Sequence, residues 1–108
     1  MWKVKFFQTT RGNYPVKEFI EKLEKKTYAR ALRSITLLQE FGPFLRMPYS
    51  KKIGQGLYEL RVKGVEAIRI FYTQANEEYY LVHAFKKKTQ KIPKQEIKLG
   101  LDRVKELI

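Results

Sequence analysis

The strongest constraint on the fold is a pair of alternating segments separated by a short, glycine-containing turn. Leu57–Val62 reads LYELRV and Ala67–Tyr72 reads AIRIFY. In each segment every second residue is apolar, which is the period of a β-strand with a buried face. The connection, Lys63–Glu66, contains Gly64. The two segments are therefore predicted to pair as an antiparallel hairpin.

The rest of the chain supplies strands and helices in an order that limits the fold class. The other expected elements are two strands, Trp2–Phe7 and Tyr79–Lys86, and three helices that begin at Pro15, near Thr27 and at Pro93. The order β-α-α-β-β-β-α predicts one α+β domain over residues 1–108, a mainly antiparallel sheet with its helices packed on one face. Phe44–Gln55 is expected to be irregular. Leu32 is expected on the buried stripe of the second helix, and Ile108 on that of the last.

Two arginines are predicted to face each other across the hairpin. If the turn is Gly64-Val65-Glu66, Arg61 lies directly opposite Arg69, on the face without the apolar set. Like charges in that position destabilise a sheet, although Glu59 could relieve part of the repulsion. Two guanidinium forks on a rigid sheet suit a phosphate, because each can donate in bidentate fashion. The competing interpretation is a pair of solvated arginines on an open sheet face.

A run of lysines continues directly from the last predicted strand. FKKKTQKIPKQEI places five lysines before its first acid, in a chain of formal net charge +12. Lys51 and Lys52 precede the hairpin and are expected to reach the same rim. Such a field attracts nucleic acid, an acidic protein or anionic lipid. A solvated loop is the alternative, but arginines and aromatic residues such as Phe85 nearby favour a groove for RNA or DNA, where aromatic faces stack on unpaired bases.

Several other chemistries lack the residues that they need. The chain has no cysteine, and His83 and Asp102 are its single histidine and aspartate, so neither a His/Cys metal site nor a two-metal nuclease is expected. No glycine-rich phosphate loop occurs, and no cofactor is expected. His83 shares a face with Leu81 and Phe85, which favours a structural role over an acid–base role. No apolar run approaches the roughly 20 residues of a membrane span, and lysines interrupt the first one, so a cytoplasmic location is expected.

Two blocks, GLYELRVKGVEAIRIFY and LVHAFKKKTQKIPKQEIKLGLDR, together resemble the RelE/ParE toxin superfamily, in particular its phage-associated HigB-like branch. The resemblance runs from about Lys51 to Arg103. It implies a RelE-like fold and a toxin of a type II toxin–antitoxin system that enters the ribosomal A site and cuts messenger RNA. The implied partners are messenger RNA, the ribosome and a helix-turn-helix antitoxin that neutralises the toxin and represses the shared operon.

The resemblance also implies roles for particular residues. Arg69 matches the strand arginine that the family uses near the scissile phosphate, and Arg61 matches the arginine of the preceding strand. The segment where the family places further cationic or polar groups of the site holds Lys86, Lys87, Lys88 and Gln90. The sequence departs from the family in lacking an obvious terminal catalytic tyrosine.

Elementary chemistry gives the same residues a mechanism. A metal-free cut of RNA proceeds by attack of the ribose 2′-OH on the adjacent phosphorus, and the two arginines would stabilise the extra negative charge of the transition state. A base must remove the 2′-OH proton, and the candidates are a lysine of the run and His83. The predicted catalytic residues are Arg61, Arg69, His83, Lys87 and Lys88. The predicted RNA-binding residues are Lys51, Lys52, Phe85, Lys86, Gln90 and Lys91.

Two other functions stay open at this point. A ParE-like toxin of the same fold would inhibit DNA gyrase without cutting nucleic acid, and a basic RNA- or DNA-binding domain would have no catalysis. The HigB-like block favours the ribonuclease. That interpretation requires both guanidinium groups to converge on one surface patch beside the lysines, without being locked into internal ion pairs.

Overall fold

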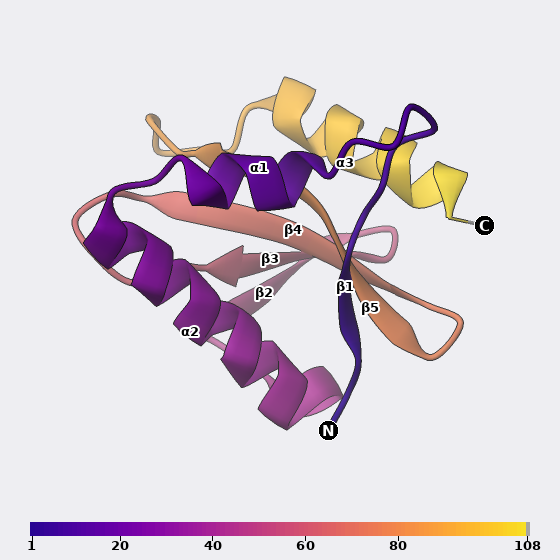
Figure 1. Ribbon diagram of the computed structural model, residues 1–108, viewed down its shortest axis with the longest axis horizontal. Helices are drawn as coiled ribbons and strands as arrows, with labels where there is room; N and C mark the ends of the chain where they lie inside the picture. The colour runs from indigo at the N-terminus through magenta and orange to yellow at the C-terminus, as the bar shows by residue number, and fades with distance from the viewer. Residues whose placement is uncertain (108) are drawn as a thin grey trace.

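The predicted hairpin forms the middle of a five-stranded sheet (Figure 1). The computed structural model describes residues 1–107. Its elements in chain order are β1 (Val4–Phe6), α1 (Pro15–Glu21), α2 (Lys25–Phe41), the 3-10 turn η1 (Gly42–Phe44), β2 (Ser50–Gly54), β3 (Leu57–Arg61), β4 (Ile68–Ala75), β5 (Glu78–Lys86) and α3 (Lys94–Glu106). The strand order is β1-β5-β4-β3-β2. Neighbouring strands are antiparallel except β1, which pairs in parallel with β5.

The pairing register of β3 and β4 is the one that the short turn predicted, with Arg61 opposite Arg69. The strand β2 was not expected, because SKKIG shows no alternation of apolar and polar residues. It forms by pairing with the edge of β3, where Lys51 lies opposite Glu59 and Lys52 opposite Tyr58. The segment predicted to be irregular therefore contributes β2, an edge strand of the sheet.

The helices cover both faces of the sheet. α1 and α2 pack on the face that carries Leu60 and Ile70. α3 packs on the opposite face, against Leu57 and Phe71. The α+β class and the mainly antiparallel sheet are confirmed, but the expectation that all helices share one face is corrected. The second face has an apolar surface of its own, and burying it against a helix is favourable.

Gly100 lies on the face of α3 that packs against the sheet. A Cβ atom at this position would lie 2.9 Å from the ring of Phe71 and 3.3 Å from a methyl carbon of Leu57. The missing side chain therefore lets the helix approach the strands closely. This contact offsets the loss of about 1 kcal/mol in helix propensity that glycine brings relative to alanine.

The C-terminus of α2 is covered by the first residues of the chain. Gly42 ends the helix with φ +50°, and a Cβ atom there would overlap the ring of Trp2. The N–H of Trp2 donates to the carbonyl of Gln39 over 3.0 Å. Trp2 is thus held in direct contact with the glycine that closes α2.

The stripes predicted for two helices are only partly as expected. Leu32 is 40% exposed, because α2 turns Ala31 and Ile35 toward the sheet and leaves Leu32 to one side. Ile108 lies outside the described residues. Within residues 1–107, none of the helices combines the length and the apolar character that crossing a lipid bilayer demands.

Candidate functional site

An open polar pocket lies where the beginning of β4 meets the loop that follows β5. The N–H of Lys87 donates to the carbonyl of Ala67 over 2.7 Å, which ties the loop to the hairpin turn. The pocket has a volume of about 390 Å³ and is lined by Ala67, Arg69, Lys87, Lys88, Thr89 and Gln90. Four predicted site residues therefore meet in one cavity. Within residues 1–107, its lining carries three cationic side chains and no carboxylate.

Arg61 and Arg69 share one buried carboxylate on the α3 side of the sheet. The Nε of Arg61 donates to Oε1 of Glu59 over 2.9 Å. The Nε of Arg69 lies 3.4 Å from Oε2 of Glu59, an ion pair that lacks the geometry of a hydrogen bond. The side chain of Glu59 is only 1% exposed, against 29% for Arg61 and 14% for Arg69. Glu59 therefore fixes the direction of both guanidinium groups.

This ion-pair cluster corrects the expectation of two uncommitted guanidinium forks. The two groups do converge on one patch, but each is held in an internal ion pair. One condition of the ribonuclease interpretation is therefore met and the other is not, so that interpretation no longer rests on a free pair of arginines. One carboxylate against two guanidinium groups leaves a single net positive charge. Within residues 1–107, Arg61 is engaged only through its Nε, while Arg69 also donates from Nη1 to the carbonyl of Ile68 over 3.3 Å. The remaining terminal nitrogens can still donate to an anion, but with about half the charge that the sequence suggested.

His83 lies in the core beneath α3 and does not line the polar pocket. Its Nε2 lies 2.6 Å from Oε1 of Glu96, and its Nδ1 lies 3.4 Å from Nη1 of Arg103. A guanidinium can only donate, so Nδ1 accepts and the ring proton sits on Nε2, which donates to Glu96. Burial lowers the pKa of His83, although Glu96 acts in the opposite direction. These contacts favour the structural role over the acid–base role.

The buried imidazole is expected to make stability depend on pH. Because its pKa is lowered from the ordinary value of 6.5, the unfolded chain takes up a proton first as the pH falls. The contribution of His83 to the free energy of unfolding is therefore complete above pH 6.5 and declines as the pH falls toward the folded-state pKa. The free energy of unfolding, measured by denaturant titration at several pH values, should change less steeply with pH for His83→Gln than for the wild type. Identical slopes would contradict the neutral, buried imidazole.

The other predicted RNA-binding residues do not extend the pocket. Phe85 is buried, with its ring 5.2 Å from that of Phe71. The prediction that it stacks on a base is corrected, because the alternation of β5 directs this ring beneath α3. Lys86 is held by Glu66 at 2.8 Å, a hydrogen bond that keeps the pKa of Glu66 below its usual value. Lys91 is exposed and is not part of the lining.

Lys51 and Lys52 belong to a different cavity. They are exposed on β2 and line a pocket that shares no residue with the pocket of Arg69. The expectation that they reach the same rim as the lysine run is therefore not met by the pocket linings. The sequence could not place them, because their position depends on the pairing of β2 with β3.

The residues that orient the predicted side chains could be recognised only in part from the sequence. The signal for Glu59 was present, since LYELR puts it on the same strand face as Arg61. Glu96 and Arg103 carry no such signal, because they reach His83 from a helix whose face could not be assigned. Within residues 1–107, no group of three or more His, Asp or Glu side chains is arranged to hold a metal ion.

Comparison with known proteins supports the sequence resemblance at the level of the family. A family model described as phage-derived protein Gp49-like (DUF891) matches residues 18–105, a range that runs from α1 to the last turn of α3. A search of curated proteins finds no match. Because the model matches most of the chain, the family is established. The chain belongs to the Gp49-like family of phage-derived proteins, a RelE-related, toxin-like family found in toxin–antitoxin systems.

Proposed function

We propose that this protein is the toxin of a type II toxin–antitoxin system, with HigB-like activity as an endoribonuclease that cuts messenger RNA in the ribosomal A site. The observation that carries the proposal is the polar pocket, where Arg69, Lys87, Lys88 and Gln90 line one open cavity to which the described residues add no carboxylate. Such a lining attracts the phosphodiester backbone of RNA. Membership of a toxin-like family supplies the biological context.

The pocket residues suit an attack by the ribose on its own phosphodiester. The 2′-OH loses its proton, its oxygen bonds to the adjacent phosphorus, and the bond from phosphorus to the 5′ oxygen of the next nucleotide breaks. That oxygen takes up a proton, which gives a 2′,3′-cyclic phosphate and a free 5′-hydroxyl. Arg69 stabilises the extra negative charge of the transition state through terminal nitrogens that Glu59 does not engage, and Arg61 lies on the neighbouring strand outside the pocket lining. Lys87 and Lys88 are the groups of the pocket that can accept and donate the two protons.

The proposed partners follow from the same surface. Messenger RNA and the A site of the ribosome present phosphates, which a chain of formal net charge +12 attracts at long range. A helix-turn-helix antitoxin is proposed as the neutralising protein, and an acidic surface on it would be drawn to the same cationic face. The reaction is confined to RNA, because DNA lacks the 2′-OH.

Induced expression in growing cells, followed by mapping of new RNA ends, tests this proposal. Growth arrest with cuts inside translated reading frames, and none in the same message carrying a disabled start codon, is the expected result. Arrest with intact messages and DNA damage would instead assign a ParE-like action on gyrase. Growth without arrest would assign a basic binding domain without catalysis.

The lysines of the pocket should set the salt dependence of RNA binding. Removing both Lys87 and Lys88 by substitution with alanine is expected to weaken binding of a single-stranded oligoribonucleotide most at low salt. The slope of log K against log salt concentration is negative, and its magnitude should decrease by about 0.7 for each lysine removed. Lys86→Ala is the matched control, because Glu66 already neutralises Lys86 and its loss should change the slope less. If Lys86→Ala changed the slope as much as each lysine of the pair does, the assignment of Lys87 and Lys88 to the RNA-binding pocket would be contradicted.

A further inference from the structure

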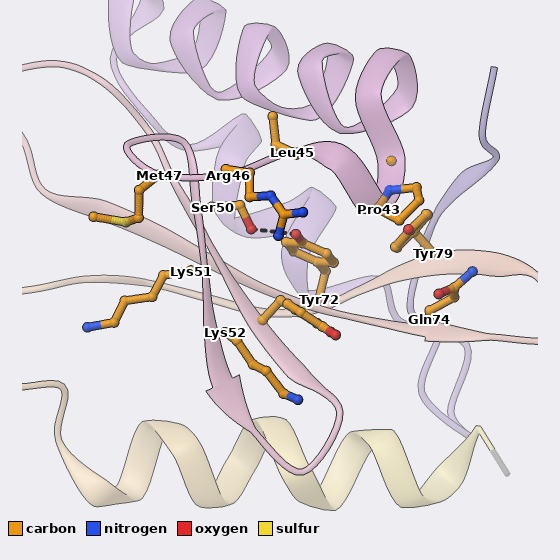
Figure 2. Close-up of a pocket in the computed structure, with 12 residues that line it drawn as sticks. Pro43, Leu45, Arg46, Met47, Ser50, Lys51, Lys52, Tyr72, Gln74 and Tyr79 are labelled. Carbon is orange, nitrogen blue, oxygen red and sulfur yellow. Dashed lines mark hydrogen bonds between the residues drawn. The ribbon is translucent and has the colours of Figure 1, made fainter.

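A second cavity lies on the α2 side of the sheet, and the proposed cleavage chemistry does not use it. Figure 2 shows it between the chain that follows α2 and the strands, with α3 on the far side of the sheet. Its volume is about 390 Å³, which is within the range of cavities that hold small molecules. Tyr72 on β4 lines it. Tyr72 and Arg69 point to opposite faces of that strand, so the two cavities lie on opposite sides of the sheet.

The inner wall of this cavity is aromatic. The ring of Tyr58 stacks on that of Tyr72 with centroids 5.4 Å apart and an angle of 18° between the planes. The ring of Tyr79 meets Tyr72 edge-on at 5.8 Å. Tyr58 is the partly exposed member of the three, so it can offer an aromatic face to a planar ligand. Burial raises the pKa of Tyr72 and of Tyr79, which keeps this wall uncharged.

Polar groups at fixed positions accompany the rings. The hydroxyl groups of Ser50 and Tyr72 share a buried hydrogen bond of 2.5 Å. Figure 2 shows the guanidinium of Arg46 turned toward this pair, while the amide of Gln74 lies on the other side of Tyr72. An amide offers both donors and an acceptor, as the edge of a nucleobase requires.

The charged side chains that line the cavity, among the described residues, are all positive. Arg46, Lys51 and Lys52 are exposed and line it. Within residues 1–107 none of the three forms an ion pair, and no carboxylate contributes to the lining. Cations that line one cavity without internal partners favour an anionic ligand. Because the inner wall is aromatic, this anion is expected to carry a flat, uncharged ring.

We propose that this cavity binds one unpaired nucleotide of an RNA strand, with its base against Tyr58 and its phosphate between Arg46 and Lys52. The choice of RNA rests on the proposed function. An acidic peptide would satisfy the cations but would leave the aromatic wall and the amide of Gln74 without a matching partner. A nucleotide uses both, since base stacking on tyrosine and charge-assisted contacts to phosphate are the usual terms of single-strand binding.

The chain contains a natural reporter for this binding. Trp2 is its one tryptophan, and the ring of Trp2 packs on Gly42, which lines the cavity. Titration of the purified protein with uridine 5′-monophosphate is expected to change the fluorescence of Trp2 in a saturable way. Inorganic phosphate should bind at least tenfold more weakly, because it lacks the base.

Substitutions locate the nucleotide. Arg46→Ala and Lys52→Ala should each weaken binding of uridine 5′-monophosphate about tenfold, as expected for one lost charge-assisted contact. Lys26→Ala removes the same charge from the exposed surface of α2 and should leave the affinity within about twofold. Equal affinity for phosphate and nucleotide, tighter binding of a triglutamate peptide, or an effect of Lys26→Ala equal to that of Lys52→Ala would each overturn the proposal.

The test separates this inference from the proposed function. The doubly substituted protein, Lys87→Ala with Lys88→Ala, should bind uridine 5′-monophosphate as the wild type does, because those lysines line the other cavity. Nucleotide binding that depends on Arg46, in a protein that cuts no message, would uphold the second cavity and reject the cleavage proposal. Cleavage without such binding would do the reverse.

Discussion

Replacing Arg69 with alanine is expected to lower messenger-RNA cleavage by about two to three orders of magnitude and to abolish growth arrest. Arg69 is the arginine that lines the polar pocket within residues 1–107, and removing one preorganised donor to a charged transition state typically has an effect of about this size. Single-turnover cleavage of a message on purified ribosomes measures the loss. Arg69→Lys should recover only part of the rate, since an ammonium keeps the charge without the planar fork.

The fold should survive this substitution. Glu59 keeps its hydrogen bond to Arg61 when Arg69 is removed, so the buried carboxylate retains a cationic partner. Circular dichroism and thermal unfolding check this for each variant. Arg11→Ala, at an exposed turn before α1, is the matched control and should cut as the wild type does. A folded Arg69→Ala protein with full toxicity would show that the pocket is not the site of cleavage.

The largest expected loss of stability comes from Glu59. Glu59→Ala leaves Arg61 and Arg69 opposite each other in the sheet without the carboxylate that now holds both. Removing one partner of a buried ion pair typically costs about 3–5 kcal/mol. The free energy of unfolding from urea titration should therefore fall by about that amount. A fall below about 1 kcal/mol would mean that the cluster is far weaker than its burial indicates.

A double substitution identifies the cause of that loss. Glu59→Leu combined with Arg69→Leu removes the buried carboxylate together with its less exposed cation, and leaves Arg61 at the partly solvated position. Stability should recover in part relative to Glu59→Leu alone, because an apolar replacement of a whole buried pair is often nearly neutral. Glu66→Ala is the control, since it breaks the exposed pair with Lys86 and should not measurably affect stability.

The hairpin shows how much of the fold the sequence contains. The alternation of LYELRV and AIRIFY and the short turn between them predicted the register that places Arg61 opposite Arg69, and the structure confirms it. The element order and the α+β class follow from equally local signals. The meeting of Arg69 with the lysine run was also predictable, because consecutive hairpin strands bring their ends together.

Two parts of the site depended on contacts that local patterns do not record. The predicted position of α3 was wrong. The apolar stripe of an amphipathic helix shows that one face of the helix is buried, but it does not show which side of the sheet the helix covers. The same error affected the roles predicted for Phe85 and His83. Both lie on the sheet face that α3 covers, so neither side chain is open to RNA. The ion pairs of Glu59 required three side chains to meet between two strands, and alternation alone gives their common face without their distances.

The parallel pairing of β1 with β5 has a consequence for how this chain is made. Val4–Phe6 is translated well before its partners, which run from Tyr79 to Leu81. During synthesis the first strand therefore has no neighbour until β5 has left the exit tunnel. Lys87 and Lys88 emerge later still. A nascent copy therefore lacks both the pairing of its first strand and its cationic loop until β5 and the residues after it have emerged.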